Sequence, residues 1–336
     1  MPEVGTCSGP TVTASKPSTP TPTPLPAAGT ATASITHSTL KDWAEGQFAG
    51  LRTVTVGDGA LTLEEGGTGG VYTSTILAAP WEFMALGATW YARPPAGAGL
   101  QVEVRTKLAG QDWGPWQVLR PMEDPVRQGP LVATDLLFGL GDALQYRLTL
   151  RAAPDGSAPV VENLRWVLLD ARPGPTAEQL AAQRLDAPGR PAVISRSAWG
   201  ADESLMTLPP EYRPVRAVII LHTATDDGGL DPAAIVRAIY YYHAVVLEKG
   251  DIGYNSLVDR WGNIYEGRAG GPGVVGSHAG RFNWGSIGIA LIGNLQENDV
   301  STPMWESLSE FLAWQCTDFM LPPLEERLFI DLVLPP

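Results

Sequence analysis

One histidine of the sequence stands where a ligand-binding group is expected. His222 directly follows an apolar run in "VIILHTAT" (218–225) and precedes Thr223 and Thr225. Open α/β sheets bind ligands at the carboxyl ends of their strands, and a neutral imidazole is a common metal ligand. A catalytic zinc site needs three protein ligands, yet the chain has only four histidines and two cysteines. A lone histidine here is more often structural than metal-bound, so its interpretation depends on its partners.

Further residues able to do chemistry lie C-terminal to His222. A tyrosine hydroxyl can stabilise a developing oxyanion, and histidines can bind metal or transfer protons. The candidates are His243 in a helical stretch, Tyr254 in "DIGYNSLVD", Arg268 at the end of "GNIYEGR", and His278 and Asn283 in "VVGSHAGRFN".

The segments around these residues resemble one family. They are "SAWGA", "VIILHTAT", "YYYHAVVLEKGDIGYNSLVDRWGNIYEGRAGG" and "VVGSHAGRFNWGSIGIALIGN". In order and spacing they are similar to the superfamily of peptidoglycan recognition proteins and type 2 N-acetylmuramoyl-L-alanine amidases, over about residues 193–334. The resemblance implies a phage-lysozyme-like amidase fold, peptidoglycan as the partner, and Zn²⁺ as the cofactor that activates water for cleavage of the lactyl–L-alanine amide.

The resemblance also implies roles for individual residues. His222 corresponds to the first zinc ligand, and Tyr254 corresponds to the catalytic tyrosine near the zinc-bound water. The substrate-binding residues implied by their positions are His278, Asn283, Arg268 and His243. His243 lies in the helix that faces the sheet, where a position behind the metal site or in the core is equally open.

The end of the sequence departs from the family pattern. The family's other two zinc ligands, a histidine and a cysteine, follow its last helix, but no histidine follows His278 and Cys316 lies inside the predicted helix. We expect a C-terminally truncated amidase domain whose two missing ligands lie beyond Pro336, so that this chain is inactive or impaired. The alternatives are a non-catalytic peptidoglycan-binding protein, and a metal site shared by His222, His243 and His278.

The sequence before the amidase-like segment predicts two further regions. Residues 1–38 are rich in Pro and Thr and poor in large apolar side chains, which predicts a disordered segment. Residues 39–170 contain about eight short alternating runs separated by Gly, Pro and Asp, which predicts an antiparallel β-sandwich. Trp113 and Trp116 lie near a hairpin tip, where exposed indoles could stack on sugars, although core or edge packing is the commoner role.

The remaining residues predict a linker and a mixed α/β domain. Residues 171–192 contain a short helical stretch between Pro and Gly and predict a linker between domains. In 193–336, an apolar strand at 217–221, a helix from Asp231, a hairpin with its turn at 261–263, a strand at 285–294 and a second helix from Ser301 alternate. This order predicts a central sheet with helices on its faces.

Composition limits the partners. The chain has 336 residues, and 23 basic against 36 acidic residues give a net charge of −13, which argues against a nucleic-acid partner. No run approaches the ~20 apolar residues of a transmembrane helix, and the N-terminus shows no signal peptide. A wall-directed amidase is nevertheless expected to be secreted or associated with the cell wall. The sequence does not indicate an oligomeric state.

Overall fold

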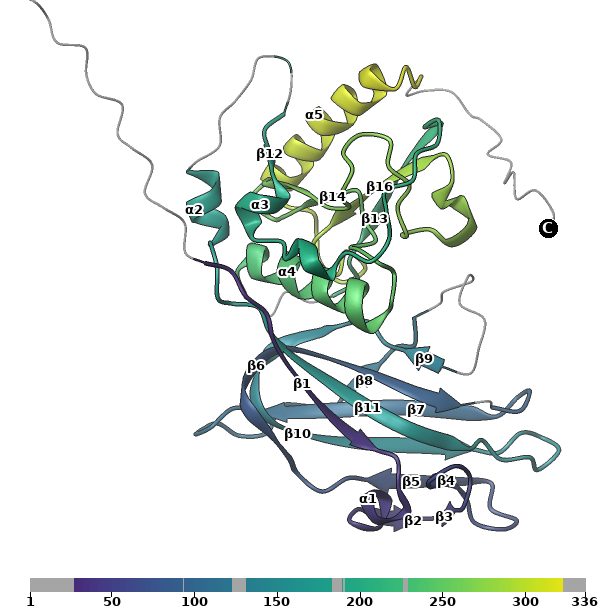
Figure 1. Ribbon diagram of the computed structural model, residues 1–336. Helices are drawn as coiled ribbons and strands as arrows, with labels where there is room; N and C mark the ends of the chain where they lie inside the picture. The colour runs from purple at the N-terminus through teal and green to yellow at the C-terminus, as the bar shows by residue number, and fades with distance from the viewer. Residues whose placement is uncertain are drawn as a thin grey trace, which may run out of the picture.

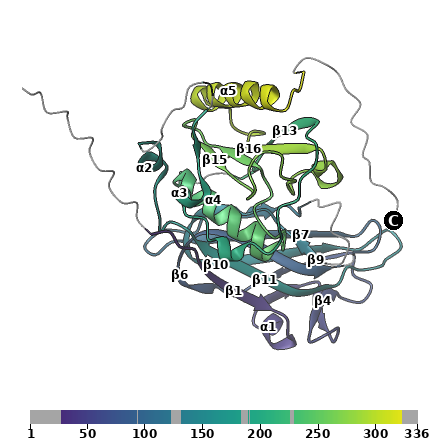
Figure 2. The same cartoon turned by 45° about the horizontal axis from the view of Figure 1, so that its top comes forward.

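The protein is built from four stacked layers. The computed structural model describes residues 27–92, 94–122, 131–182, 189, 191–225 and 229–322. The layers are an 11-stranded antiparallel sheet, helix α4 (Pro232–Tyr241), a five-stranded mixed sheet and helix α5 (Thr302–Asp318). Figures 1 and 2 show α4 between the two sheets and α5 on the other face of the smaller sheet. The predicted mixed α/β fold with helices on the faces of a sheet is confirmed.

The large sheet contains all the strands of the N-terminal half. They are β1 (Ala31–His37), β2 (Gln47–Ala49), β3 (Leu51–Val54), β4 (Ala60–Leu63), β5 (Gly69–Thr73), β6 (Leu77–Ala92), β7 (Gly99–Lys107), β8 (Gln117–Leu119), β9 (Leu131–Ala133), β10 (Leu137–Arg151) and β11 (Val161–Asp170). A short helix, α1 (Leu40–Ala44), follows β1 and is capped by Thr39. The predicted strands are therefore present, together with shorter ones that the alternation pattern did not indicate.

The predicted β-sandwich is not confirmed. In the described residues, strands β1 to β11 are joined by hydrogen bonds into one sheet rather than two. The physical reason is the length of β6 and β10, at 16 and 15 residues, because each pairs with different neighbours along its course. Shifts in register interrupt the β6–β10 pairing and mark where the sheet is irregular.

Strand β1 corrects the N-terminal prediction. A disordered segment through residue 38 is wrong for Ala31–His37, which pair along β11 from Asp170 to Leu164. The last proline of the tail is Pro26, so every residue of the later segment "ATASITH" has a backbone N–H that can take part in strand pairing. Its Ile35 side chain packs against the core of the large sheet. Residues 1–26 lie outside the described residues.

Strand β11 is covered on both faces. Leu164, Trp166 and Leu168 belong to the core of the large sheet. The alternate residues Val167 and Leu169 belong to a second core, which includes α4. Side chains alternate across a strand, so the nearly continuous apolar run of β11 reflects a sheet packed on both sides.

The smaller sheet positions the C-terminal half. Its order is β12 (Val193–Ile194), β15 (Ile264–Glu266), β14 (Ser256–Val258), β16 (Ser286–Leu291) and β13 (Ala217–His222). The strands β13, β14 and β16 are parallel, and β14 and β15 form the predicted antiparallel hairpin. Short helices connect these strands, namely α3 (Arg196–Trp199), η1 (Glu203–Leu205) and η3 (Gly280–Asn283).

Both predicted long helices begin where their caps indicate. Asp231 accepts hydrogen bonds from the first turn of α4, whose first residue is Pro232, and Ser301 caps α5. The residues of α4 from Pro232 to Tyr240 are all buried, as expected for a helix between two layers. The helix continues as one π-turn, η2 (Tyr242–Val246). No helix in the described part of the chain is long and apolar enough to cross a membrane.

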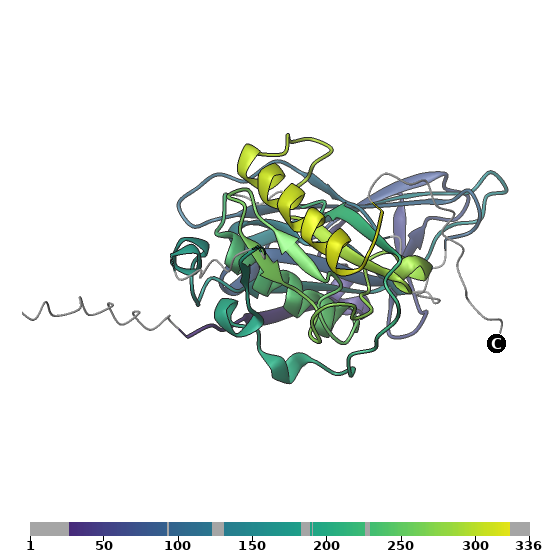
Figure 3. The same ribbon diagram turned by 90° about the horizontal axis from the view of Figure 1, so that it is seen from above.

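The predicted linker is packed against α4. Residues Ala177–Ala181 form helix α2, and the Asp231 carboxylate accepts a hydrogen bond from Ala177 N–H. The buried Arg237 guanidinium donates to the carbonyls of Ala171 and Pro175 at 2.9 and 3.1 Å. The large sheet and the C-terminal half also share one apolar core. Separate domains joined by a linker are therefore not confirmed, and Figure 3 shows the smaller sheet and α5 lying over the large sheet.

Candidate functional site

His222 ends strand β13 at the carboxyl edge of the smaller sheet. It is half-buried, and its Nδ1 accepts a hydrogen bond from Leu295 N–H at 3.0 Å. This bond fixes the ring and directs the other nitrogen, Nε2, away from that loop. A histidine held through one ring nitrogen presents the other one to a ligand or metal.

Tyr254 and His243 come together beside the residues that follow His222. Their rings are 5.4 Å apart. Together with Thr223 and Thr225 they line one small cavity. The Thr223 and Thr225 hydroxyls are 2.9 Å apart. We call these four residues the Tyr254 site.

Burial keeps both rings of the Tyr254 site neutral. Desolvation raises the pKa of Tyr254 above its ordinary value, so the phenol remains a hydrogen-bond donor at neutral pH. Desolvation also holds the pKa of His243 well below its ordinary value, with Lys249 and Arg268 adding to the effect. Its Nδ1 accepts from Gly253 N–H at 3.0 Å, so the neutral ring carries its proton on Nε2.

His278 lies close to the same site. The Gly253 carbonyl accepts from Ser277 N–H at 2.8 Å, which places His278 next to the loop that contacts His243. A Cβ atom added at Gly288 would lie 2.4 Å from His278 Cγ, so strand β16 needs glycine there. Both ring nitrogens are buried and lack hydrogen-bond partners among the described residues, and burial lowers the pKa to about 4.

Asn283 and Arg268 hold loops around the site. The Asn283 side-chain oxygen accepts from the N–H groups of His278 and Ala279 at 2.8 and 2.7 Å. Arg268 donates to the carbonyl of Ile252 at 3.3 Å. In these positions both side chains hold the backbone of loops next to the Tyr254 site. Their contacts with substrate stay predictions.

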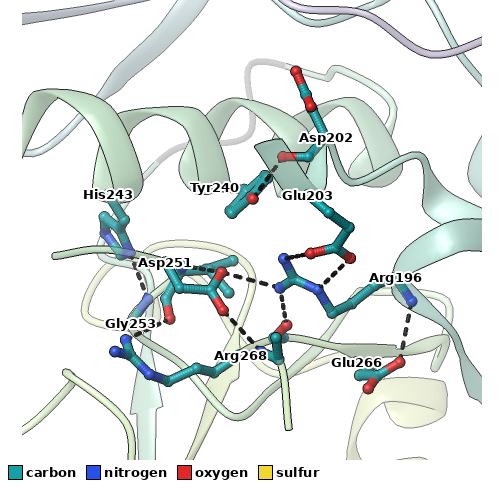
Figure 4. A network of polar contacts seen from close by, with 12 residues as sticks. Arg196, Asp202, Glu203, Tyr240, His243, Asp251, Gly253, Glu266 and Arg268 are labelled. Carbon is teal, nitrogen blue, oxygen red and sulfur yellow. Dashed lines mark hydrogen bonds and ion pairs between the residues drawn. The ribbon is translucent and has the colours of Figure 1, made fainter. Parts of the chain in front are cut away.

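A buried ion network supports the loop that carries Tyr254. Arg196 donates to the Asp251 carboxylate at 3.0 Å and to Glu203 at 2.8 Å, and it also contacts the Gly267 carbonyl. The other Asp251 oxygen accepts from Ala269 N–H at 2.8 Å. Figure 4 shows Asp251 joining α3 to the loops on either side of the hairpin, with His243 and Gly253 beside it. Motif reasoning included "SAWGA" but missed Arg196, which directly precedes it.

The large sheet contributes a residue that the sequence did not indicate. Asp135, between β9 and β10, lines the cavity of the Tyr254 site together with Met122 and Leu136. No sequence signal could have found it, because its position depends on how the large sheet packs against the C-terminal half.

The described residues do not assemble a zinc site by themselves. Within residues 27–92, 94–122, 131–182, 191–225 and 229–322, no three or more His, Cys, Asp or Glu side chains converge as metal ligands. His222, His243 and His278 therefore do not share a metal in the way the third interpretation required. Cys316 lies within α5, as predicted. Zinc coordination stays a prediction.

The tryptophan pair of the large sheet is packed against arginines. The Arg105 guanidinium lies over both Trp113 and Trp116, 4.8 and 4.7 Å from the ring centroids. Arg147 lies 4.7 Å from the Trp116 ring centroid and pairs with Glu103. These cation–π contacts occupy ring faces that a sugar would need, so the structural role of the pair is favoured.

Comparison with known proteins identifies the C-terminal half. The family model of N-acetylmuramoyl-L-alanine amidases matches residues 211–333. Peptidoglycan-recognition protein SA of Drosophila melanogaster is 35% identical over 125 residues, which are 37% of this chain and 60% of that protein. Peptidoglycan recognition protein 3 of Homo sapiens is 35% identical over 138 residues, or 40% of this chain and 38% of that protein.

The chain thus spans less than two thirds of these relatives' lengths. Among solved structures, Drosophila peptidoglycan recognition protein SA matches with 32% identity and a TM-score of 0.35, covering 40% of this chain and 76% of that one. The matched sequence region contains His222, the Tyr254 site and the hairpin β14–β15. Over residues 211–333, the chain is therefore similar to the N-acetylmuramoyl-L-alanine amidase family, and the relatives that match in this half are peptidoglycan recognition proteins.

Proposed function

We propose that the chain binds peptidoglycan at the Tyr254 site. The observation that carries the proposal is the convergence of neutral hydrogen-bonding side chains from three elements, namely Thr223 after β13, His243 in η2 and Tyr254 before β14. Neutral donors and acceptors suit the amides and hydroxyls of a muramyl peptide. The relatives named as peptidoglycan recognition proteins support the same ligand.

Retention on insoluble peptidoglycan tests this proposal. We expect the wild-type protein to sediment with purified cell wall, and the Tyr254→Ala variant to remain largely in the supernatant. Tyr91→Ala is the matched control, because Tyr91 is an exposed residue on the large sheet. Equal retention of the Tyr254→Ala and wild-type proteins would rule out binding at this site, and no retention of the wild-type protein would rule out the function.

A specific observation also favours amidase activity as the second candidate. Two groups that the family resemblance assigns to catalysis are in suitable states: His222 is anchored through Nδ1 with Nε2 available, and Tyr254 keeps its phenolic proton. In the proposed reaction, water adds to the lactyl carbonyl, the C–N bond to L-alanine breaks, and the nitrogen leaves as an amine. A protonated phenol near the carbonyl would stabilise the oxyanion by hydrogen bonding.

Muropeptide digestion separates the two candidates. The purified chain is incubated with soluble muropeptides in the presence of zinc and, in parallel, with a chelator, and its metal content is measured. Zinc-dependent release of stem peptides with a new amino terminus supports the amidase. Binding without release supports the recognition protein. Since peptidoglycan lies outside the cytoplasm, both candidates propose a secreted or wall-associated protein.

A further inference from the structure

The large sheet forms one wall of the Tyr254 site. Met122, Asp135 and Leu136, which lie in segments next to strands of the large sheet, line a cavity together with Thr223, Thr225, His243 and Tyr254. The cavity has about 20 Å³ of space for a water-sized group. The two walls come from parts of the chain more than eighty residues apart in sequence. Any ligand atom in this cavity is therefore in contact with both halves of the protein.

Asp135 introduces a carboxylate into this cavity without a partner. In the described part of the chain, its side chain makes no hydrogen bond or ion pair, and the groups that act on it do so only through longer-range charge. Burial raises the pKa of Asp135 above its ordinary value, and the charges of Lys249, His222 and Arg120 partly offset this. A half-buried carboxylate without a partner is energetically costly, and such groups concentrate at binding sites.

The position of Asp135 is fixed by its neighbour. Thr134 is fully buried, its N–H donates to the Ala88 carbonyl, and its hydroxyl accepts from Ala88 N–H at 3.0 Å. The Thr134 carbonyl accepts a hydrogen bond from the Tyr242 hydroxyl at 2.8 Å. These bonds tie the backbone before Asp135 to both the large sheet and the π-turn, so the backbone that carries the carboxylate is held beside the cavity.

We propose that Asp135 is a specificity-determining residue that receives a primary ammonium group of the bound stem peptide. The inference rests on the proposed function. A primary ammonium matches the cavity because it is compact, carries the opposite charge and has three donors. The Asp135 carboxylate and the hydroxyl oxygens of Thr223 and Thr225 can accept the hydrogen bonds that the ammonium group donates. A guanidinium group is larger than the space, and an amide or hydroxyl would leave the charge unpaired.

Two amino groups of a stem peptide share this chemistry. One is the α-amino group of its first residue, which is present when the lactyl amide has been cleaved. The other is the side-chain amino group of a basic stem residue. Three forms of the tripeptide L-Ala–D-isoGln–L-Lys distinguish them: the free peptide, the α-N-acetylated peptide and the side-chain N-acetylated peptide.

Calorimetric titration of the full-length protein with the three peptides tests the inference. We expect acetylation of one of the two amines to weaken binding to the wild-type protein by about tenfold or more. In the Asp135→Asn variant, the free and acetylated peptides should bind equally. Asp142→Asn is the matched control, since Asp142 lies in strand β10 and its carboxylate accepts an exposed hydrogen bond from Ala109 N–H.

Each outcome decides the inference separately from the proposed function. Wild-type protein that is retained on peptidoglycan but binds all three peptides equally, or not at all, would overturn the ammonium site alone. The same holds if Asp135→Asn keeps the wild-type preference. The wild-type comparison does not depend on how well the variant folds. Loss of retention on peptidoglycan, by contrast, would overturn the proposed function.

Discussion

At the scale of single residues, the side chains in and next to the Tyr254 site are mostly neutral, and charged side chains lie around them. His243 and His278 lose charge by burial, while Lys249 and Arg268 act on both of them. The fixed charges lie in the surrounding loops rather than in the cavity itself. Asp135 is the exception among the residues that line it.

The acid sensitivity of His278 gives a first prediction. Its pKa is about 4 in the folded protein, against an ordinary value of 6.5. Between these values the unfolded chain binds the proton more readily, so the free energy of unfolding should fall as pH falls from 6.5 to 4, by up to about 3 kcal/mol. Urea unfolding at several pH values measures the slope, and His278→Asn should reduce it. An unchanged slope in this variant contradicts the assignment.

The buried ion pair behind Tyr254 gives a second prediction. Asp251 is only 2% exposed and pairs with Arg196, so Asp251→Ala leaves the buried guanidinium without its buried carboxylate partner. We expect a loss of about 3–5 kcal/mol in the free energy of unfolding, measured by urea unfolding. Glu211→Ala is the control, because Glu211 pairs with Arg213 at the surface and should cost at most about 1 kcal/mol. Equal costs would contradict the interpretation.

At the scale of elements, the π-turn η2 joins the site to the large sheet. It places His243 in the Tyr254 site, and its first residue, Tyr242, lines the same cavity and donates a hydrogen bond to the Thr134 carbonyl. A Cβ atom added at Gly87 would lie 2.6 Å from the Tyr242 hydroxyl oxygen, so β6 has glycine where the tyrosine approaches. One helical turn therefore positions both a site residue and an anchor.

Removing that anchor gives a third prediction. Tyr242→Phe deletes the hydroxyl that donates to Thr134 and leaves a buried carbonyl with one bond fewer. We expect a loss of about 1–2 kcal/mol in the free energy of unfolding, and weaker binding of the free tripeptide as the Asp135 segment loosens. Tyr241→Phe, at the adjacent half-buried position, should change neither quantity. Thermal denaturation and calorimetric titration provide the measurements.

The sequence predicts individual elements better than their assembly. The caps Asp231 and Ser301 and the turn at Gly262 are local signals, and the helices and hairpin follow them. The single large sheet could not be predicted, because its continuity depends on how β6 and β10 share neighbours. Likewise, His222 and Tyr254 were found through their motifs, whereas Asp135 became visible only once the two halves were packed together.

At the scale of the whole molecule, the two halves stabilise each other. The core around α4 draws residues from β6, β10, β11 and the smaller sheet, and Arg237 links α4 to Ala171, Pro175 and Trp199. A helix that is buried on every side loses its environment if either layer separates. The large sheet and the C-terminal half therefore depend on one shared core.

Cooperative unfolding gives a fourth prediction. Because the halves share a core, we expect one transition in differential scanning calorimetry, with the calorimetric and van't Hoff enthalpies in agreement. Fluorescence and circular dichroism should report the same midpoint. Two separate transitions, or different midpoints for the two methods, would show that the halves unfold independently.

Strand β11 has a consequence for which sequence changes the protein can tolerate. Trp166 and Leu168 face one core and Val167 and Leu169 face the other, so inserting a single residue before them would exchange the two sets. The indole would then enter the space beside α4, and a smaller aliphatic chain would replace it on the opposite face. The packing of both cores would be disrupted, because each face of β11 is buried against one of them. In a family of homologues, β11 should accept substitutions that preserve volume while excluding insertions and deletions almost entirely.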